Sequence, residues 1–87
     1  MQKLFKALSS EIRLRIVEIL LEKDSTICYC DFVERLGKDR SVIYRHFKKL
    51  ESAGLIETVK DGKKLKGRLK NSEYIAKLLD YAKKVDK

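Results

Sequence analysis

The sequence contains no proline and no tryptophan, a single histidine and only two cysteines. One histidine, without a paired-carboxylate motif or a glycine-rich phosphate loop, leaves little from which to build a catalytic site, so we expect no enzymatic activity. No run approaches the roughly 18 consecutive apolar residues of a membrane span, and residues 1 to 20 carry charges too often for a signal peptide. These absences predict an intracellular, cytoplasmic protein without a membrane partner.

Positive charge is in clear excess, because 21 Lys and Arg residues face 13 Asp and Glu residues, for a formal net charge of +8. The long-range field of such a chain attracts polyanions, which makes nucleic acid the leading partner class. With 87 residues the chain is expected to form a single domain over residues 1–87. The core of so small a domain is thin, so pairing with a second copy is a natural supplement.

The first part of the chain has the apolar periodicity of helices. Residues 2–8 and about 11–23 each carry apolar side chains at helical spacing, and Arg13 is predicted to lie on the solvent face of the second helix. A short third helix, about 30–36, is predicted to end at Gly37, since glycine readily adopts the left-handed conformation found after helices.

The segment that follows has the pattern of a helix with a signal at each end. Asp39 is placed to cap the first free N–H groups with its carboxylate, and Gly54 supplies the left-handed residue that ends the helix. Isoleucine, phenylalanine and leucine at spacings of four and three form one apolar stripe between them. The side chains predicted to face outward are Arg40, Ser41, Tyr44, Arg45 and Lys48.

Two helices joined by so short a turn match a helix-turn-helix over about residues 30–54. The periodicity then changes, and two strand-like runs within about residues 55–69 flank Asp61-Gly62, a strong signal for a two-residue hairpin turn. This hairpin is predicted to be a wing whose apolar face carries Ile56, Thr58, Leu65 and Leu69. Its tip and returning strand concentrate the basic residues Lys60, Lys63, Lys64, Lys66 and Arg68.

The last predicted helix covers about residues 72–85 and carries a broad apolar face that no other segment obviously covers. We therefore expect this helix to pack with residues 2–8 against the same segments of a second copy. The predicted dimer interface consists of Leu4, Phe5, Leu8, Ile75, Leu78, Leu79 and Ala82.

The order of four helices, a hairpin and a last helix resembles the ArsR/SmtB family of winged helix-turn-helix repressors over nearly the whole chain. The segments that carry the resemblance are Leu4-Phe5-Lys6-Ala7-Leu8-Ser9, Arg13-Leu14-Arg15-Ile16, Ser41-Val42-Ile43-Tyr44-Arg45-His46-Phe47, Ala53-Gly54-Leu55-Ile56 and Asp61-Gly62-Lys63. The resemblance implies a mainly α fold with a small β-hairpin, dimeric through its terminal helices. It also implies a homodimer that binds an operator in double-stranded DNA and that, in many members, releases it when a metal or metalloid binds.

The two basic clusters lie on consecutive elements, and in a winged helix both have a role on DNA. The outward residues in the first half of the helix are candidates to contact base edges, whereas Lys48, Lys63, Lys64 and Arg68 are candidates to hold phosphates. One alternative is that the clusters form a solvated, stabilising surface. Another is a nucleic-acid-coating or architectural protein that uses charge without sequence preference.

The two cysteines form the segment Cys28-Tyr29-Cys30-Asp31 at the start of the third helix. The resemblance places here the Cys-x-Cys-Asp segment of arsenic- and cadmium-sensing members, with Cys28 and Cys30 as thiolate ligands of a soft metal or metalloid ion. A closed zinc site needs four ligands, and one chain offers too few. A disulfide and inert packing are the alternatives. The single histidine, His46, is predicted to be structural.

Overall fold

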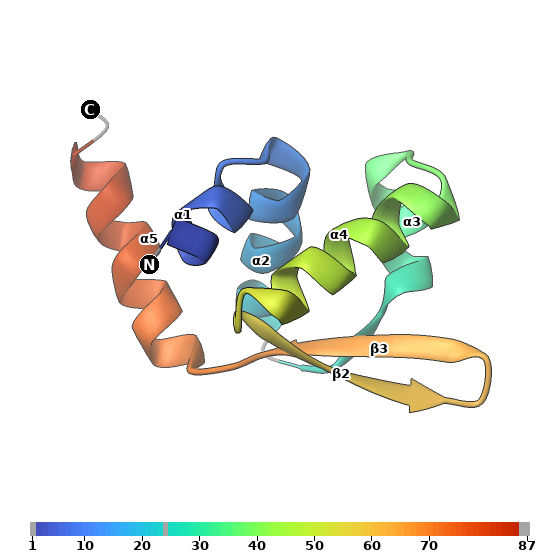
Figure 1. The fold of residues 1–87 in the computed structure, drawn as a ribbon. Coiled ribbons are helices and arrows are strands. Elements are labelled where there is room, and N and C mark those ends of the chain that lie inside the picture. The colour runs from blue at the N-terminus through green and yellow to red at the C-terminus, as the bar shows by residue number, and fades with distance from the viewer. Residues whose placement is uncertain (1, 24, 86–87) are drawn as a thin grey trace.

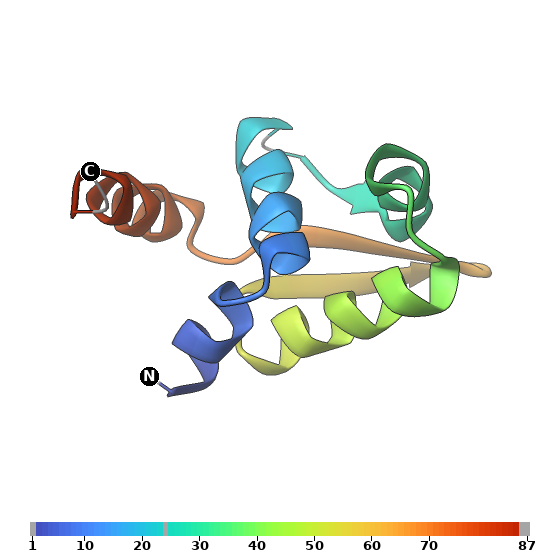
Figure 2. The ribbon, with the colours of Figure 1, turned by 90° about the horizontal axis from the view of Figure 1, so that it is seen from above.

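The computed structural model describes residues 2–23 and 25–85, and it has the predicted winged helix-turn-helix order. The elements are α1 (Gln2–Leu8), α2 (Glu11–Lys23), β1 (Ile27–Cys28), α3 (Tyr29–Leu36), α4 (Arg40–Ser52), β2 (Ile56–Asp61), β3 (Lys64–Leu69) and α5 (Ser72–Val85). The antiparallel strands lie in the order β1-β3-β2. Helices α2, α3 and α4 lie on one side of this sheet, and α5 stands beyond its end, near α1 (Figures 1 and 2). No helix in the part of the chain that is described is long and apolar enough to cross a membrane.

The core lies between α4 and the sheet. Ile43, Phe47 and Leu50 are fully buried, so the predicted apolar stripe of α4 is confirmed. The ring of Phe47 packs edge-on against Phe32 of α3, with the ring centroids 5.5 Å apart. A Cβ atom at Gly67 of β3 would lie only 2.9 Å from the Phe47 ring. Glycine at this position therefore lets β3 approach α4 closely.

The hairpin has the predicted apolar face. Its register pairs Ile56 with Leu69 and Lys60 with Leu65, and paired residues of an antiparallel ladder project to the same side. Ile56 and Leu65 are both buried, so the root of the wing belongs to the core.

The predicted turn was wrong by one residue. Asp61 pairs with Lys64 as the last rung of the ladder, so the turn consists of Gly62 and Lys63. Gly62 has φ +66°, and glycine adopts this left-handed conformation without steric cost.

Strand β1 was not predicted. Ile27 pairs with Gly67 and Cys28 with Lys66, which ties the start of α3 to the wing. Two residues are too few for an alternating pattern, so only the partner strand makes this segment a strand.

The predicted signal at the C-terminal end of α4 is confirmed, whereas the predicted cap at its N-terminal end is wrong in part. Gly54 has φ +79° and ends the helix, just as Gly37 with φ +63° ends α3. Asp39 occupies the N-cap position of α4, but its side chain makes no capping hydrogen bond. This carboxylate is exposed, so water can satisfy it and the free N–H groups alike.

Arg13 was predicted to face solvent, and the structure shows that this is wrong, because its side chain is buried. Its Nε donates to the carbonyl of Ala7 at 2.7 Å, and one Nη donates to the carbonyl of Lys6 at 3.3 Å. The other Nη lies 3.0 Å from Nδ1 of His46 on α4. Carbonyls in the last turn of a helix lack partners within the helix and attract a cation, so the end of α1 draws the guanidinium inward.

Helix α5 has two apolar faces where one was predicted. Ile75 is buried and Leu79 packs against the core of the same chain. Ile75 is thus removed from the surface that a second copy could contact, which corrects the predicted interface. At 100° per residue a second face forms from residues that remain partly or largely exposed. These are Tyr74, Leu78, Tyr81, Ala82 and Val85.

Candidate nucleic-acid interface

Helix α4 separates its apolar and polar residues cleanly, because its buried stripe fixes which side faces outward. The five residues predicted to face outward are all exposed: Arg40, Ser41, Tyr44, Arg45 and Lys48. A solvent-facing helix of this kind has the size to enter the major groove of DNA.

The hairpin tip lies at the same end of the molecule as the start of α4, and both views show this arrangement (Figures 1 and 2). The turn between Gly62 and Lys63 is exposed on both of its residues. The first half of α4 and the tip therefore lie at one end of the molecule, here called the basic end. Its cations are Arg40, Arg45, Lys60, Lys63 and Lys64.

Three of the predicted DNA-contacting cations are already engaged with carboxylates: Lys48 in the second half of α4, Arg68 toward the root of the wing, and Lys66, which reaches Asp61 beside the hairpin tip. The pairs are Lys48–Glu51 at 3.2 Å, Lys66–Asp61 at 3.3 Å and Arg68–Glu57 at 2.9 Å. The cations of the basic end make no ion pair with any residue in the ranges 2–23 and 25–85. The basic end thus carries five cations that no carboxylate in these ranges engages, on an exposed helix and an exposed hairpin tip.

Tyr44 is held in place although 39% of its surface is exposed. The ring of Tyr29, the first residue of α3, packs edge-on against it with the centroids 6.1 Å apart. The Nζ of Lys48 lies 5.8 Å from the centroid of the Tyr44 ring, within cation–π range. A ring fixed from two sides loses little conformational entropy on meeting DNA.

His46 is structural, as predicted. It is partly buried, and its Nδ1 must accept the bond from Arg13, because a guanidinium only donates. Burial lowers the pKa of His46 below its ordinary value, and the charges of Arg13, Arg45 and Lys49 lower it further. The neutral ring therefore joins α2 to α4.

The thiols of Cys28 and Cys30 lie at the start of α3. Cys28 is buried and occupies the N-cap position, where its sulfur accepts a bond from the backbone N–H of Cys30 at 3.4 Å. The Cys28 thiol holds the pKa of Cys30 above its ordinary value, burial and Asp31 act in the same direction, and Lys64 opposes them. The wing lysine is thus close enough to influence this thiol.

These donors do not fit a closed metal site within one chain. Among residues 2–23 and 25–85, no group of three or more His, Cys, Asp or Glu side chains is placed to hold an ion. The assignment of Cys28 and Cys30 as ligands stays a prediction.

The fold and the basic end together define a winged helix-turn-helix domain with α4 as its recognition helix. Residues 10–58 match the model of a family described as "Bacterial regulatory protein, arsR family". The arsenical resistance operon repressor of Escherichia coli K12 is 37% identical over 82 residues, which are 92% of this chain and 69% of the repressor. The chain therefore belongs to the ArsR family, a family of transcriptional regulators and not of enzymes, as the sequence predicted.

Two further similarities agree with this assignment. The cadmium resistance transcriptional regulatory protein CadC of Listeria innocua is 34% identical over 67 residues, 77% of this chain, and the chain spans only 56% of CadC. A homodimeric winged helix-turn-helix DNA-binding domain from Mycobacterium bovis has the same fold, with a TM-score of 0.81 at 22% identity over 98% of this chain and 76% of that one.

Proposed function

We propose that this protein is a homodimeric, sequence-specific DNA-binding repressor of transcription that acts in the cytoplasm. The observation that carries the proposal is the basic end, where cations without carboxylate partners lie on the recognition helix and on the hairpin tip at once. A merely solvated surface gives no reason for these cations to gather on two elements at one end of the molecule.

The two elements divide the work on DNA. Arg40, Ser41, Tyr44 and Arg45 lie in the exposed first half of α4 and contact base edges in the major groove. Lys48, Lys60, Lys63, Lys64, Lys66 and Arg68 contact phosphates beside the groove. Among these side chains arginine discriminates best between bases, since it can bond guanine with two parallel hydrogen bonds.

The second apolar face of α5 supports a homodimer. Tyr81 and Val85 are 69% and 66% exposed in the single chain, and Phe5 of the neighbouring α1 is 57% exposed. Tyr81 and Val85 lie on one face of α5, and large apolar side chains exposed on one face mark an interaction surface. The similar Mycobacterium bovis domain is described as homodimeric. Leu4, Leu8, Leu78, Leu79 and Ala82 complete the proposed interface, and the two recognition helices then lie about 34 Å apart.

Relatives named for cadmium and arsenical resistance suggest a soft-ion signal, and the residues through which it would act are Cys28 and Cys30. The two thiols of one chain do not complete a metal site, so the proposal assigns no ion to them.

Selection from a random duplex library tests the function. The wild-type protein is expected to enrich one pseudo-palindromic sequence and to bind it at least about 10³-fold more tightly than a scrambled duplex at equal salt. A nucleic-acid-coating protein would enrich no sequence and would bind both duplexes alike. Salt dependence alone does not separate the two, because both neutralise phosphates.

A further inference from the structure

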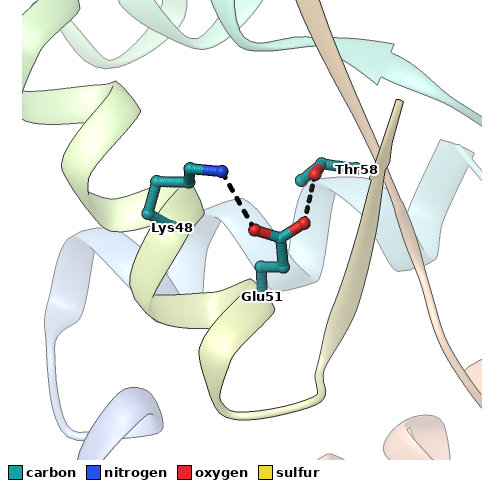
Figure 3. Close-up of polar contacts among 3 residues, drawn as sticks. All are labelled: Lys48, Glu51 and Thr58. Atoms are coloured by element: carbon teal, nitrogen blue, oxygen red, sulfur yellow. Dashed lines mark hydrogen bonds and ion pairs between the residues drawn. The ribbon is translucent and has the colours of Figure 1, made fainter. Parts of the chain in front are cut away.

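Glu51, in the last turn of α4, joins the recognition helix to the wing. The hydroxyl of Thr58 on β2 donates a hydrogen bond to one carboxylate oxygen of Glu51, and the Nζ of Lys48 lies 3.2 Å from the other (Figure 3). The bond from Thr58 is the largest cause that holds the pKa of Glu51 below its ordinary value; burial opposes it, and the bond from Lys48 and its charge lower the pKa further. Glu51 is therefore ionised at neutral pH.

The carboxylate determines where Lys48 lies. Tyr44, Lys48 and Glu51 follow one another at spacings of four and three, so they share the exposed side of α4. The Nζ of Lys48 lies 3.2 Å from the Glu51 carboxylate and 5.8 Å from the centroid of the Tyr44 ring. The two contacts hold the Lys48 side chain along the helix. Its charge is partly cancelled before any DNA arrives.

The same carboxylate also links α4 to the wing across a tight turn. Only six residues separate Glu51 from Thr58, and they include the left-handed turn at Gly54. The hydrogen bond between the side chains of Thr58 and Glu51 joins the two ends of this turn. Within the turn, the backbone N–H of Gly54 donates to the backbone carbonyl of Glu51. The Thr58–Glu51 bond therefore adds a side-chain link between α4 and β2 to the buried contacts at the wing root.

We propose that Glu51 is a positioning residue for DNA binding, with two separable effects. Its hydrogen bond with Thr58 holds the wing at the angle that lets tip and helix contact one operator together. Its negative charge restrains Lys48 and so weakens attraction to any DNA. This inference rests on the proposed function and deepens it, because it names a residue that raises operator preference without contacting a base.

Two substitutions separate the effects. E51Q keeps an oxygen that accepts the Thr58 hydroxyl but removes the charge. We expect it to bind the selected operator and a scrambled duplex about 2- to 5-fold more tightly, the range of exposed ion-pair energies. The slope of log affinity against log salt concentration should steepen by up to about 0.9, the value of one full phosphate contact, because Lys48 no longer shares its charge between Glu51 and a phosphate.

T58V removes the hydroxyl and keeps the charge. We expect the ratio of operator to scrambled-duplex affinity to fall about 3- to 10-fold, the value of one hydrogen bond, with an unchanged salt slope. T58S, which restores the hydroxyl, should restore the ratio. The matched control is E22Q, which removes an exposed carboxylate from α2 on the side that faces α5 and should alter neither quantity.

The inference is overturned if E51Q keeps the wild-type salt slope or if T58V keeps the wild-type ratio while its melting temperature shows that it is folded. Should T58V fail to fold, the slope of E51Q decides. A wild-type protein that enriches no sequence overturns the proposed function itself, and this outcome is distinct because it appears before any variant is made.

Discussion

Arg13 and His46 lie 33 residues apart in the sequence, and the guanidinium of one bonds Nδ1 of the other at 3.0 Å. The same guanidinium binds two carbonyls at the end of α1. One buried side chain thus connects α1, at the proposed dimer interface, with the middle of the recognition helix.

This contact predicts a loss of stability in mild acid. The pKa of His46 is lowered in the folded chain, so the unfolded chain binds a proton first and stability rises with pH. The contribution of neutral His46 to stability is complete above pH 6.5, the ordinary pKa of histidine. It is lost as the pH falls from there through the lowered pKa of the folded chain. Urea unfolding between pH 8 and 5 checks it, and the carboxylates of Glu51 and Glu57 titrate below this window because their pKa values are lowered.

His46 is the only histidine, so its ring protons give an unambiguous NMR titration in the same samples. The control is H46Q, whose amide oxygen can still accept from Arg13 but does not titrate. Equal losses of stability in wild type and H46Q would show that another group is responsible.

Removing the guanidinium should destabilise the fold. R13M leaves the carbonyl of Ala7 and the His46 nitrogen without their donor, while the Lys6 carbonyl keeps its bonds from Ser9, and a single buried unsatisfied group costs about 1–3 kcal/mol. R15M, at an exposed position of the same helix, should change the free energy of unfolding by less than about 0.5 kcal/mol. Equal effects in a urea titration would mean that the Arg13 bonds contribute nothing.

The second apolar face of α5 should be buried between two copies. Y81D with V85D places two charges on side chains that are two-thirds exposed in the single chain, so a monomer would tolerate them. In a dimer they would be buried without partners, and sedimentation should show monomers or unfolded chains. E73K, off this face of the helix, should stay dimeric. A dimer that survives Y81D with V85D would place the interface elsewhere.

Native mass spectrometry tests the donor count at Cys28 and Cys30. Two thiols fall short of the four ligands of a closed zinc site, so we expect purified protein in reductant to retain no zinc. Zinc that is retained, and then lost in C28S with C30S, would show that a second chain completes the site. Comparison with an oxidised sample reports any disulfide as a loss of two mass units per bond.

The sequence predicted the elements in which an apolar pattern repeats over many residues. It missed the features that depend on contacts between elements. Helix α4 could be predicted because Ile43, Phe47 and Leu50 repeat over about two turns and glycine follows its end. Strand β1 could not be predicted, because it is a strand only through its pairing with Gly67 and Lys66 of β3, far along the chain.

Arg13 was misplaced for the same reason. Amphipathic patterns send charge outward, whereas the acceptors that bury this residue belong to α1 and α4. At the candidate site the exposed positions followed from the sequence. The bonds that engage Lys48, Lys66 and Arg68 depend on where β2 and β3 lie, so no spacing rule could supply them.

The central claim is that α4 reads bases while the wing holds the backbone, and operator and scrambled-duplex affinities of two variants test it most directly. R45A should lower the affinity ratio by about 5- to 150-fold, the value of one bidentate base contact. K63A with K64A should weaken both duplexes equally and reduce the salt slope by about 1.8. The account is contradicted if the wing variant loses the preference and R45A keeps it.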